Sequence, residues 1–412
     1  MYICNINAIL HIMKKVYYHR NIEKLLGKAL ADFSVVVLTG ARQTGKSTML
    51  RKILPEFRYI TLDDPVQRRI IKEDPRSVLN NLNKPLIIDE IQYVPEILSY
   101  IKILVDANSR KKGYIVLTGS QHFNMMAGIT ESLAGRAAIL TLPPFSVTEY
   151  KEENLNYPEG CFNSILTGFY PEPFIHGANI SLFYSSYIQT YIERDVRQIS
   201  EISNIDLFQT FFTLLAARSG SLLNLNEISK ECGIAFNTSK KWLTILQTSG
   251  IVYLLKPYFR NIPKRVIKSP KLYFTDTGIM SYILKYQNVD TLLSGPLSGN
   301  FYETFIVNEF LKYKYNYNAA FDIYFYRDSN GNETDLILES GGRFFLFEIK
   351  AVQTLRIEHT KNLTRQLSLF PGSKGYILGF YEEEIEISEN LTITNWTNLF
   401  RILETNLNSD NY

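Results

Sequence analysis

The sequence has little cysteine, little excess charge of either sign and no long apolar run. Its three cysteines, Cys4, Cys161 and Cys232, are far apart and form no CxxC pair. This spacing favours a reducing compartment and excludes a structural zinc site built on cysteine pairs. A formal net charge of +3 is too small to indicate a nucleic-acid partner by itself. No segment approaches the apolar length of a transmembrane helix, so we expect no membrane contact and a cytoplasmic protein.

The composition is that of a folded, soluble chain with more than one domain. Hydrophobic residues make up 45% of the sequence and charged residues 21%, which excludes a disordered protein. A length of 412 residues exceeds what one ordinary hydrophobic core accommodates. We expect the first residues to form a loosely packed extension before the first domain.

A phosphate-binding loop is the clearest motif. The pattern G-x-x-x-x-G-K-[ST] runs from Gly40 to Ser47, between an apolar β-branched run and a segment with helical periodicity. The two glycines permit the bend that aims backbone N–H groups at phosphate oxygens, Lys46 reaches the β- and γ-phosphates, and Ser47 is a ligand of Mg²⁺. A chance glycine turn is disfavoured by this strand and helix context. The predicted nucleotide-binding residues are Gly40, Ala41, Arg42, Gln43, Thr44, Gly45, Lys46, Ser47, Thr48, Asp89 and Ser120.

Two of these residues come from later strands. In KPLIIDEIQ, Asp89 and Glu90 follow a buried strand at its carboxyl end, where open α/β sheets bind ligands. Asp89 would complete the Mg²⁺ shell and Glu90 would orient and deprotonate the attacking water. Ser120, after the strand in GYIVLTGSQ, is predicted to sense the γ-phosphate. The guanine motif NKxD is missing, so we expect the cofactors to be ATP and Mg²⁺.

The middle of the chain predicts helices and a basic surface. Residues 151–177 are expected to form an irregular connector, and residues 180–201 one long helix. Residues 205–260 contain two short helices around a tight turn, followed by a strand, which is the order of a winged helix. Lys240 and Lys241 would face outward, and the stretch from Lys256 to Lys271 holds lysine and arginine without an acid. This stretch is either a DNA-binding surface or a merely solvated one.

A predicted hairpin near the end of the chain has two strands rich in apolar residues, with charged residues at a few positions. In ETDLILESGGRFFLFEIK, a two-residue turn at the two glycines places Asp335 opposite Glu348, with Lys350 on the same face. Two facing carboxylates repel unless a cation lies between them, and a divalent metal ion is the natural occupant. The alternative is an ion-pair cluster in which Lys350 bridges Glu333 and Glu348.

Four segments together resemble one family. TGARQTGKST, LIIDEIQ, LTGSQ and SLAGRAAILTLPPFSVTEY are similar to the AAA+ type P-loop ATPases of bacteria and archaea that carry a trailing domain of unknown function. The resemblance implies that Arg136 touches the γ-phosphate, either within its own subunit or across the interface of a homo-oligomer. A salt bridge that fixes the loop is the alternative role of Arg136.

The last third resembles the PD-(D/E)XK nuclease fold. The resemblance rests on Glu303 within GNFYETFIVNEFLK, followed by ETDLIL and FEIK. It implies that Asp335 and Glu348 bind Mg²⁺ or Mn²⁺, that Glu303 is a supporting acid and that Lys350 is catalytic. Thr334 replaces the proline of the motif name.

We therefore predict an α/β protein with a P-loop AAA+ type ATPase core, a winged-helix middle domain and a restriction-endonuclease-like α/β C-terminal domain. The expected function is ATP hydrolysis coupled to a metal-dependent nuclease that acts on nucleic acid. The alternative is a nucleotide-switched regulatory module with an inactive nuclease-like domain that binds DNA or protein. The predicted boundaries are 1–20 for the extension, 21–150 for the ATPase core, 151–204 for the connector and lid helix, 205–260 for the winged helix and 261–412 for the nuclease-like domain.

Overall fold

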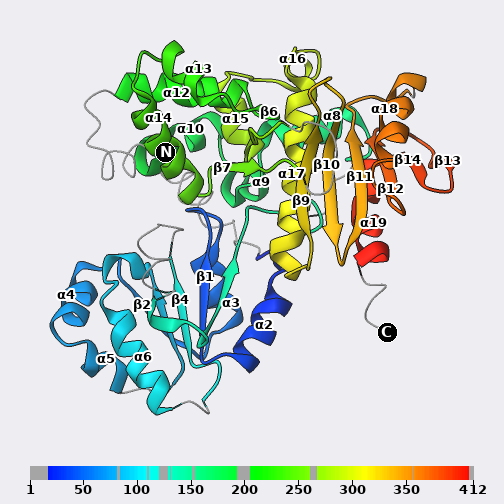
Figure 1. The fold of residues 1–412 in the computed structure, drawn as a ribbon. Helices are drawn as coiled ribbons and strands as arrows, with labels where there is room; N and C mark the ends of the chain where they lie inside the picture. Colours follow the sequence, from blue (N-terminus) through cyan, green and yellow to red (C-terminus); the bar gives the residue numbers. More distant parts are fainter. Residues whose placement is uncertain are drawn as a thin grey trace, which may run out of the picture.

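The computed structural model describes residues 17–80, 84–108, 111–119, 129, 131–150, 154–192, 205–259, 267–354 and 356–407. Figure 1 shows an N-terminal unit, blue to cyan, below a green helical segment, with the yellow and orange C-terminal sheet beside it. Within the described ranges, none of the helices combines the length and apolarity needed to cross a membrane.

The N-terminal unit is built on a parallel sheet, as predicted. Its strands, in the order β2-β3-β4-β1-β5, are β1 Val35–Thr39, β2 Arg58–Thr61, β3 Leu86–Asp89, β4 Ile115–Thr118 and β5 Ala137–Thr141. Alternate residues of β1 enter separate apolar clusters on the two faces of the sheet, so helices cover both faces. These are α2 Glu23–Asp32, α3 Lys46–Ile53, α4 Pro65–Glu73, α5 Pro75–Asn80, η1 Ile91–Tyr93 and α6 Ile97–Ala107.

The segment after this sheet is helical, which corrects the prediction of an irregular connector. It contains α8 Pro158–Thr167, α9 Pro171–His176, α10 Ile180–Tyr187 and the π-helix η2 Ile188–Ile192. The prolines of this segment start α8 and α9, where a missing N–H costs no hydrogen bond. The predicted long helix begins at Ile180 but changes to the π-helix at Ile188, and residues 193–201 lie outside the description.

The next elements follow the predicted order of helix, turn, helix and strand. They are α12 Ile205–Ala217, β6 Ser221–Leu222, α13 Leu225–Glu231, α14 Phe236–Thr248, β7 Val252–Leu255 and β8 Lys271–Phe274. β8 pairs with both β6 and β7 in one antiparallel sheet. The predicted boundary between residues 260 and 261 is therefore wrong, because it separates β8 from the strands with which it pairs.

The C-terminal unit has a mixed sheet in the order β13-β14-β12-β11-β10-β9. Its strands are β9 Asp322–Arg327, β10 Glu333–Ser340, β11 Arg343–Ile349, β12 Lys374–Gly379, β13 Ile385–Ser388 and β14 Leu391–Asn395. Its helices are α15 Thr277–Ile283, α16 Val289–Leu293, α17 Ser298–Tyr317, α18 Ile357–Leu367, η3 Trp396–Asn398 and α19 Leu399–Leu407. The predicted hairpin is confirmed, because Ser340 pairs with Arg343 across Gly341 and Gly342, both with positive φ.

Helix α17 joins the three parts of the molecule. It lies against β5 of the first sheet, β8 of the middle sheet and β11 of the last sheet. The middle and C-terminal parts share one apolar cluster that includes Phe211, Phe274, Phe305 and Phe347. Figure 1 shows α17 in yellow between the green helices and the orange strands.

Candidate nucleotide-binding site and C-terminal charge cluster

The loop after β1 has a backbone that only glycine adopts readily at two points. Gly40 has φ +147°, and a Cβ there would lie 2.3 Å from the carbonyl oxygen of Leu142, at the end of β5. Gly45 has φ +93° and directly precedes α3. Positive φ at both positions turns the loop into the first turn of α3. The local conformation is the one that the motif predicts.

Lys46 is buried inside this loop. Its ammonium group donates hydrogen bonds to the carbonyl oxygens of Ala41, at 2.8 Å, and Gly40, at 3.1 Å. Burial lowers the pKa of Lys46 to about 8, although Glu90 and Asp89 oppose this effect. A buried ammonium group held by neutral carbonyls is suited to exchange them for the anionic oxygens of a phosphate.

The Asp89 carboxylate accepts hydrogen bonds from hydroxyl groups on three elements. Ser47 Oγ donates to Asp89 Oδ2 at 2.8 Å, and the hydroxyls of Tyr59 on β2 and Thr118 on β4 also donate to this carboxylate. A serine hydroxyl beside a carboxylate is an oxygen donor set that fits Mg²⁺. Sequence reasoning missed Tyr59 because its strand carries no motif, and it chose Ser120 over Thr118. Ser120 lies outside the described residues.

Glu90 stands in a strained conformation. Its φ of +59° and ψ of +47° place a non-glycine residue in the left-handed region. This conformation costs free energy, and residues that adopt it are concentrated at functional sites. Burial raises the pKa of Glu90, whereas Lys46 and a hydrogen bond from Gln92 lower it. A carboxylate with a raised pKa is better suited to accept a proton from water.

Lys46, Ser47 and Glu90 line one cavity of 390 Å³. The rest of its lining includes Gln43, Thr44, Gly45 and Thr48 of the loop and α3, and Tyr17, Tyr18, Phe145, Ile175 and His176 contribute aromatic and apolar surface. The Arg42 carbonyl accepts a hydrogen bond from Tyr187.

A larger cavity of 730 Å³ is lined by parts of α10, α12 and α15 and, in its described lining, has Lys285 as its charged side chain. It lacks the donor set that a triphosphate needs.

Arg136 does not reach this cavity. It directly precedes β5, and its carbonyl accepts a hydrogen bond from Val35, the first residue of β1. The phosphate-binding loop follows the other end of β1, about 16 Å away for five residues. The Arg136 guanidinium pairs with Asp106 of α6. The predicted contact within one subunit is therefore wrong, whereas the contact across a subunit interface stays a prediction.

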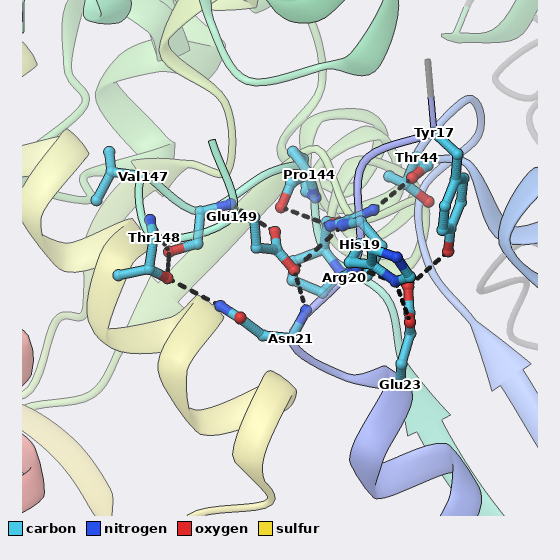
Figure 2. Close-up of polar contacts among 12 residues, drawn as sticks. Tyr17, His19, Arg20, Asn21, Glu23, Thr44, Pro144, Val147, Thr148 and Glu149 are labelled. Carbon is cyan, nitrogen blue, oxygen red and sulfur yellow. Dashed lines mark hydrogen bonds and ion pairs between the residues drawn. The ribbon is translucent and has the colours of Figure 1, made fainter. Parts of the chain in front are cut away.

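Arg20 lines the cavity and contacts the phosphate-binding loop, and sequence reasoning missed it. Only 5% of Arg20 is exposed, although the prediction placed it in a loose extension. Figure 2 shows its guanidinium between Thr44, Pro144 and Glu149. It donates to the carbonyl oxygen of Thr44 at 2.9 Å and forms an ion pair with Glu149 at 3.1 Å. No local pattern reveals a partner that lies more than a hundred residues away.

The C-terminal acids lie together, as the hairpin predicts. Asp335 and Glu348 are 7% and 6% exposed. Lys350 Nζ lies 2.8 Å from Glu348 Oε1 and 3.4 Å from Asp335 Oδ2. Burial and then Asp335 raise the pKa of Glu348 to about 8. Its Oε2 atom is buried and has no hydrogen-bond partner among the described residues.

A second lysine, from β8, enters this cluster. Lys271 is 2% exposed, and its ammonium group lies 2.9 Å from Glu303 Oε1, in contact with Glu333, and 4.0 Å from Asp335 Oδ1. Tyr273 donates to the same Glu303 oxygen at 2.6 Å. Glu303, predicted as a supporting metal ligand, is therefore bound by a lysine and a tyrosine.

The cluster does not fit a metal ion as its side chains stand. Among the described residues, three or more His, Cys, Asp or Glu side chains are nowhere grouped to hold one. Ammonium groups from two lysines contact the carboxylates instead. The assignment of Asp335, Glu348 and Glu303 as metal ligands stays a prediction, as does the role of Lys350.

The basic surface is only partly available to a partner. Lys240 and Lys241 on α14 are exposed, as predicted, and so are Lys256 and Lys268. Lys271 is buried, so its inclusion in this surface is wrong. Arg260, Lys264 and Arg265 lie outside the described residues.

Three sequence families match consecutive parts of the chain. Residues 32–151 match an AAA domain, residues 159–290 a domain of unknown function (DUF8612) and residues 298–399 a domain of unknown function (DUF4143). Together with the loop, Lys46, Asp89 and the parallel sheet, the first match defines the class: the N-terminal unit is a P-loop ATPase domain of the AAA type.

Two curated relatives span nearly the whole chain. They are the uncharacterized proteins Rv2008c of Mycobacterium tuberculosis and Mb2031c of Mycobacterium bovis. Each is 28% identical over 391 residues, which are 92% of this chain and 86% of the relative.

Two solved structures show some likeness to this chain. The Walker-type ATPase PABY2304 of Pyrococcus abyssi is 16% identical, with a TM-score of 0.43, over 66% of this chain and 97% of its own. The RuvB Holliday junction branch migration motor of Thermotoga maritima is 15% identical, with a TM-score of 0.30, over 57% of this chain and 88% of its own.

Proposed function

We propose that the chain binds ATP with Mg²⁺ in the 390 Å³ cavity and hydrolyses it. The observation that carries this proposal is the 2.8 Å hydrogen bond between Ser47 and Asp89, at a loop that also holds Lys46. When bound there, Mg²⁺ would neutralise phosphate charge. Ser47 and Asp89 would hold the ion, and Lys46 would exchange its carbonyl partners for phosphate oxygens.

Glu90 is the proposed general base. Its raised pKa and its place beside Lys46 suit a carboxylate that orients water and accepts its proton. The test is ATP hydrolysis and nucleotide affinity in Lys46→Ala and Glu90→Gln. Loss of binding in the first and binding without turnover in the second are expected. Two variants that both hydrolyse ATP like the parent would refute the proposal.

The second candidate function is metal-dependent cleavage of nucleic acid by the C-terminal unit. The buried, unpartnered Oε2 of Glu348 favours it, because that oxygen is available to a further ligand. Lys271 favours the competing proposal of an inactive regulatory module, because its ammonium group already neutralises Glu303 and Glu333.

Two partner proposals follow from exposed charges. Lys240 and Lys241 on α14 would contact DNA phosphates if the segment α12 to β8 acts as a winged helix. Arg136 would reach the γ-phosphate of a neighbouring copy in a homo-oligomer, since it lies at the edge of the sheet opposite its own cavity.

A further inference from the structure

The side chain of Arg20 binds the backbone of the phosphate-binding loop. The guanidinium donates to the carbonyl oxygen of Thr44 at 2.9 Å and to that of Pro143 at 2.8 Å, and it lies 4.1 Å above the ring of Phe145. A buried cation that uses several donors at once fixes the direction of the peptide groups it binds. The Thr44 carbonyl is thus directed at the Arg20 guanidinium, and both residues line the cavity.

Glu149 binds Arg20 and connects it to Ser146. One of its oxygens forms the ion pair with Arg20 and accepts from the backbone N–H of Asn21 at 2.7 Å. The other accepts from the backbone N–H of Ser146 at 2.8 Å. Figure 2 shows Asn21, Arg20 and Glu149 joined in this way. The side chain of Glu149 is fully buried, so its charge depends on these donors.

Ser146 connects this group to α17 of the C-terminal unit. Its hydroxyl donates to Glu309 Oε2 at 2.7 Å, and the N–H of Val147 donates to the same oxygen at 3.3 Å. The other oxygen of Glu309 pairs with Lys312 at 2.7 Å. A cavity of 110 Å³, lined by Ala41 of the phosphate-binding loop and by Lys312, lies beside this contact.

We propose that Arg20 and Glu309 are positioning residues for ATP, and that α17 thereby ties the nucleotide site to the C-terminal charge cluster. The buried chain runs from the Thr44 carbonyl through Arg20, Glu149 and Ser146 to Glu309. Glu303, on the same helix, lies six residues earlier, about 9 Å along the axis, and binds Lys271. This inference rests on the proposed ATPase function.

The experiment compares two lysines of α17 that are two residues apart. Lys312 belongs to the buried chain, whereas Lys314 pairs with the exposed Asp322 at 2.7 Å. In Glu309→Gln and Lys312→Met, affinity for a fluorescent ADP analogue should fall by about fivefold or more. In Lys314→Met, it should equal that of the parent. Arg20→Gln should weaken binding likewise, and Arg20→Lys should restore part of it.

A double-mutant cycle separates positioning from general stability. Arg20→Gln and Glu309→Gln should be non-additive in nucleotide affinity, because they break the same chain. Folded variants whose thermal stability falls while their nucleotide affinity, KM and kcat equal those of the parent would overturn the inference. A parent protein that binds no nucleotide would instead refute the proposed function, so the two failures are distinguishable.

Discussion

The hydroxyl of Ser47 donates to Asp89 Oδ2 at 2.8 Å, and so connects the start of α3 with the end of β3. Because both oxygens belong to the proposed Mg²⁺ site, the pair should matter more for the metal complex than for the fold. We expect Ser47→Ala to weaken Mg·ATP binding by about tenfold or more, a loss near 1.4 kcal/mol, while it changes metal-free ADP binding less. Calorimetric titration with and without Mg²⁺ measures this difference. Lys52→Met, on the exposed side of α3 and outside the cavity lining, is the matched control.

Nucleotide binding should take up protons near pH 8. Burial lowers the pKa of Lys46 to about 8, and phosphate oxygens favour its charged form, so binding raises this pKa. The uptake should be about half a proton at pH 8 and vanish toward pH 6, where Lys46 is already charged. Affinity should fall as pH rises above 8. Calorimetry in buffers of different ionisation enthalpy gives the proton count. Lys52→Met, on the exposed side of α3, should keep the uptake, and a Lys52-dependent uptake would contradict the assignment.

The C-terminal cluster separates the two candidate functions by its response to metal. If the unit is a nuclease, Asp335→Asn should abolish Mg²⁺ or Mn²⁺ binding and DNA cleavage while ATP hydrolysis continues. Lys350→Ala should bind the metal but not cleave. Glu339→Gln, on the same strand, is the control. If the unit is an inactive module, calorimetry at millimolar metal should detect no uptake in the parent protein.

Glu348 should make stability depend on pH. Its pKa is raised from 4.5 to about 8, chiefly by burial and next by Asp335, so the folded state holds a proton that the unfolded state releases between these values. The contribution of Glu348 to the free energy of unfolding therefore falls as pH rises from 4.5 to 8. Glu348→Gln cannot lose that proton. Denaturant unfolding measures the free energy of unfolding of both proteins at pH 5 and pH 8. Between these two pH values, the free energy of unfolding of the variant minus that of the parent should rise by at least about 1 kcal/mol. An unchanged difference at the two pH values would count against a protonated Glu348.

DNA binding, if the basic surface serves it, should depend on exposed charge. Neutralising Lys240 and Lys241 on α14, or Arg260, Lys264 and Arg265 after β7, should weaken binding and reduce the slope of log affinity against log salt by about one per lost phosphate contact. Lys24→Gln with Lys28→Gln on the exposed side of α2 is the control. Equal slopes in all variants would assign these charges to a solvated surface.

The phosphate-binding loop was predictable because its chemistry is local. Eight consecutive residues carry both the backbone bend and the donors, so their order alone fixes the geometry around Lys46. The hairpin at Gly341 was predictable for a related reason, since a two-residue turn sets the register of both strands.

Contacts between distant segments were not predictable. Tyr59 and Arg20 reach the site only because the fold brings their segments to Asp89 and to the phosphate-binding loop. Lys271 was misassigned because a run of basic residues resembles a solvated surface in sequence, whereas the pairing of β8 turns this lysine inward. The helices α8 and α9 were missed because proline was interpreted as a breaker, although at the first turn it starts a helix.

The position of Lys271 limits how the protein can be divided. A fragment that begins after β8 would keep Glu303, Glu333, Asp335 and Glu348 but lose the ammonium group that contacts three of them. Such a fragment would carry unbalanced negative charge in an otherwise apolar interior, and it would attract cations that the intact chain has no need of. Metal uptake or cleavage by an excised C-terminal fragment would consequently be a result of the loss of Lys271 and not a property of the intact chain. A version of this unit that is transferred to another protein would need to include the strand from Lys271 to Phe274.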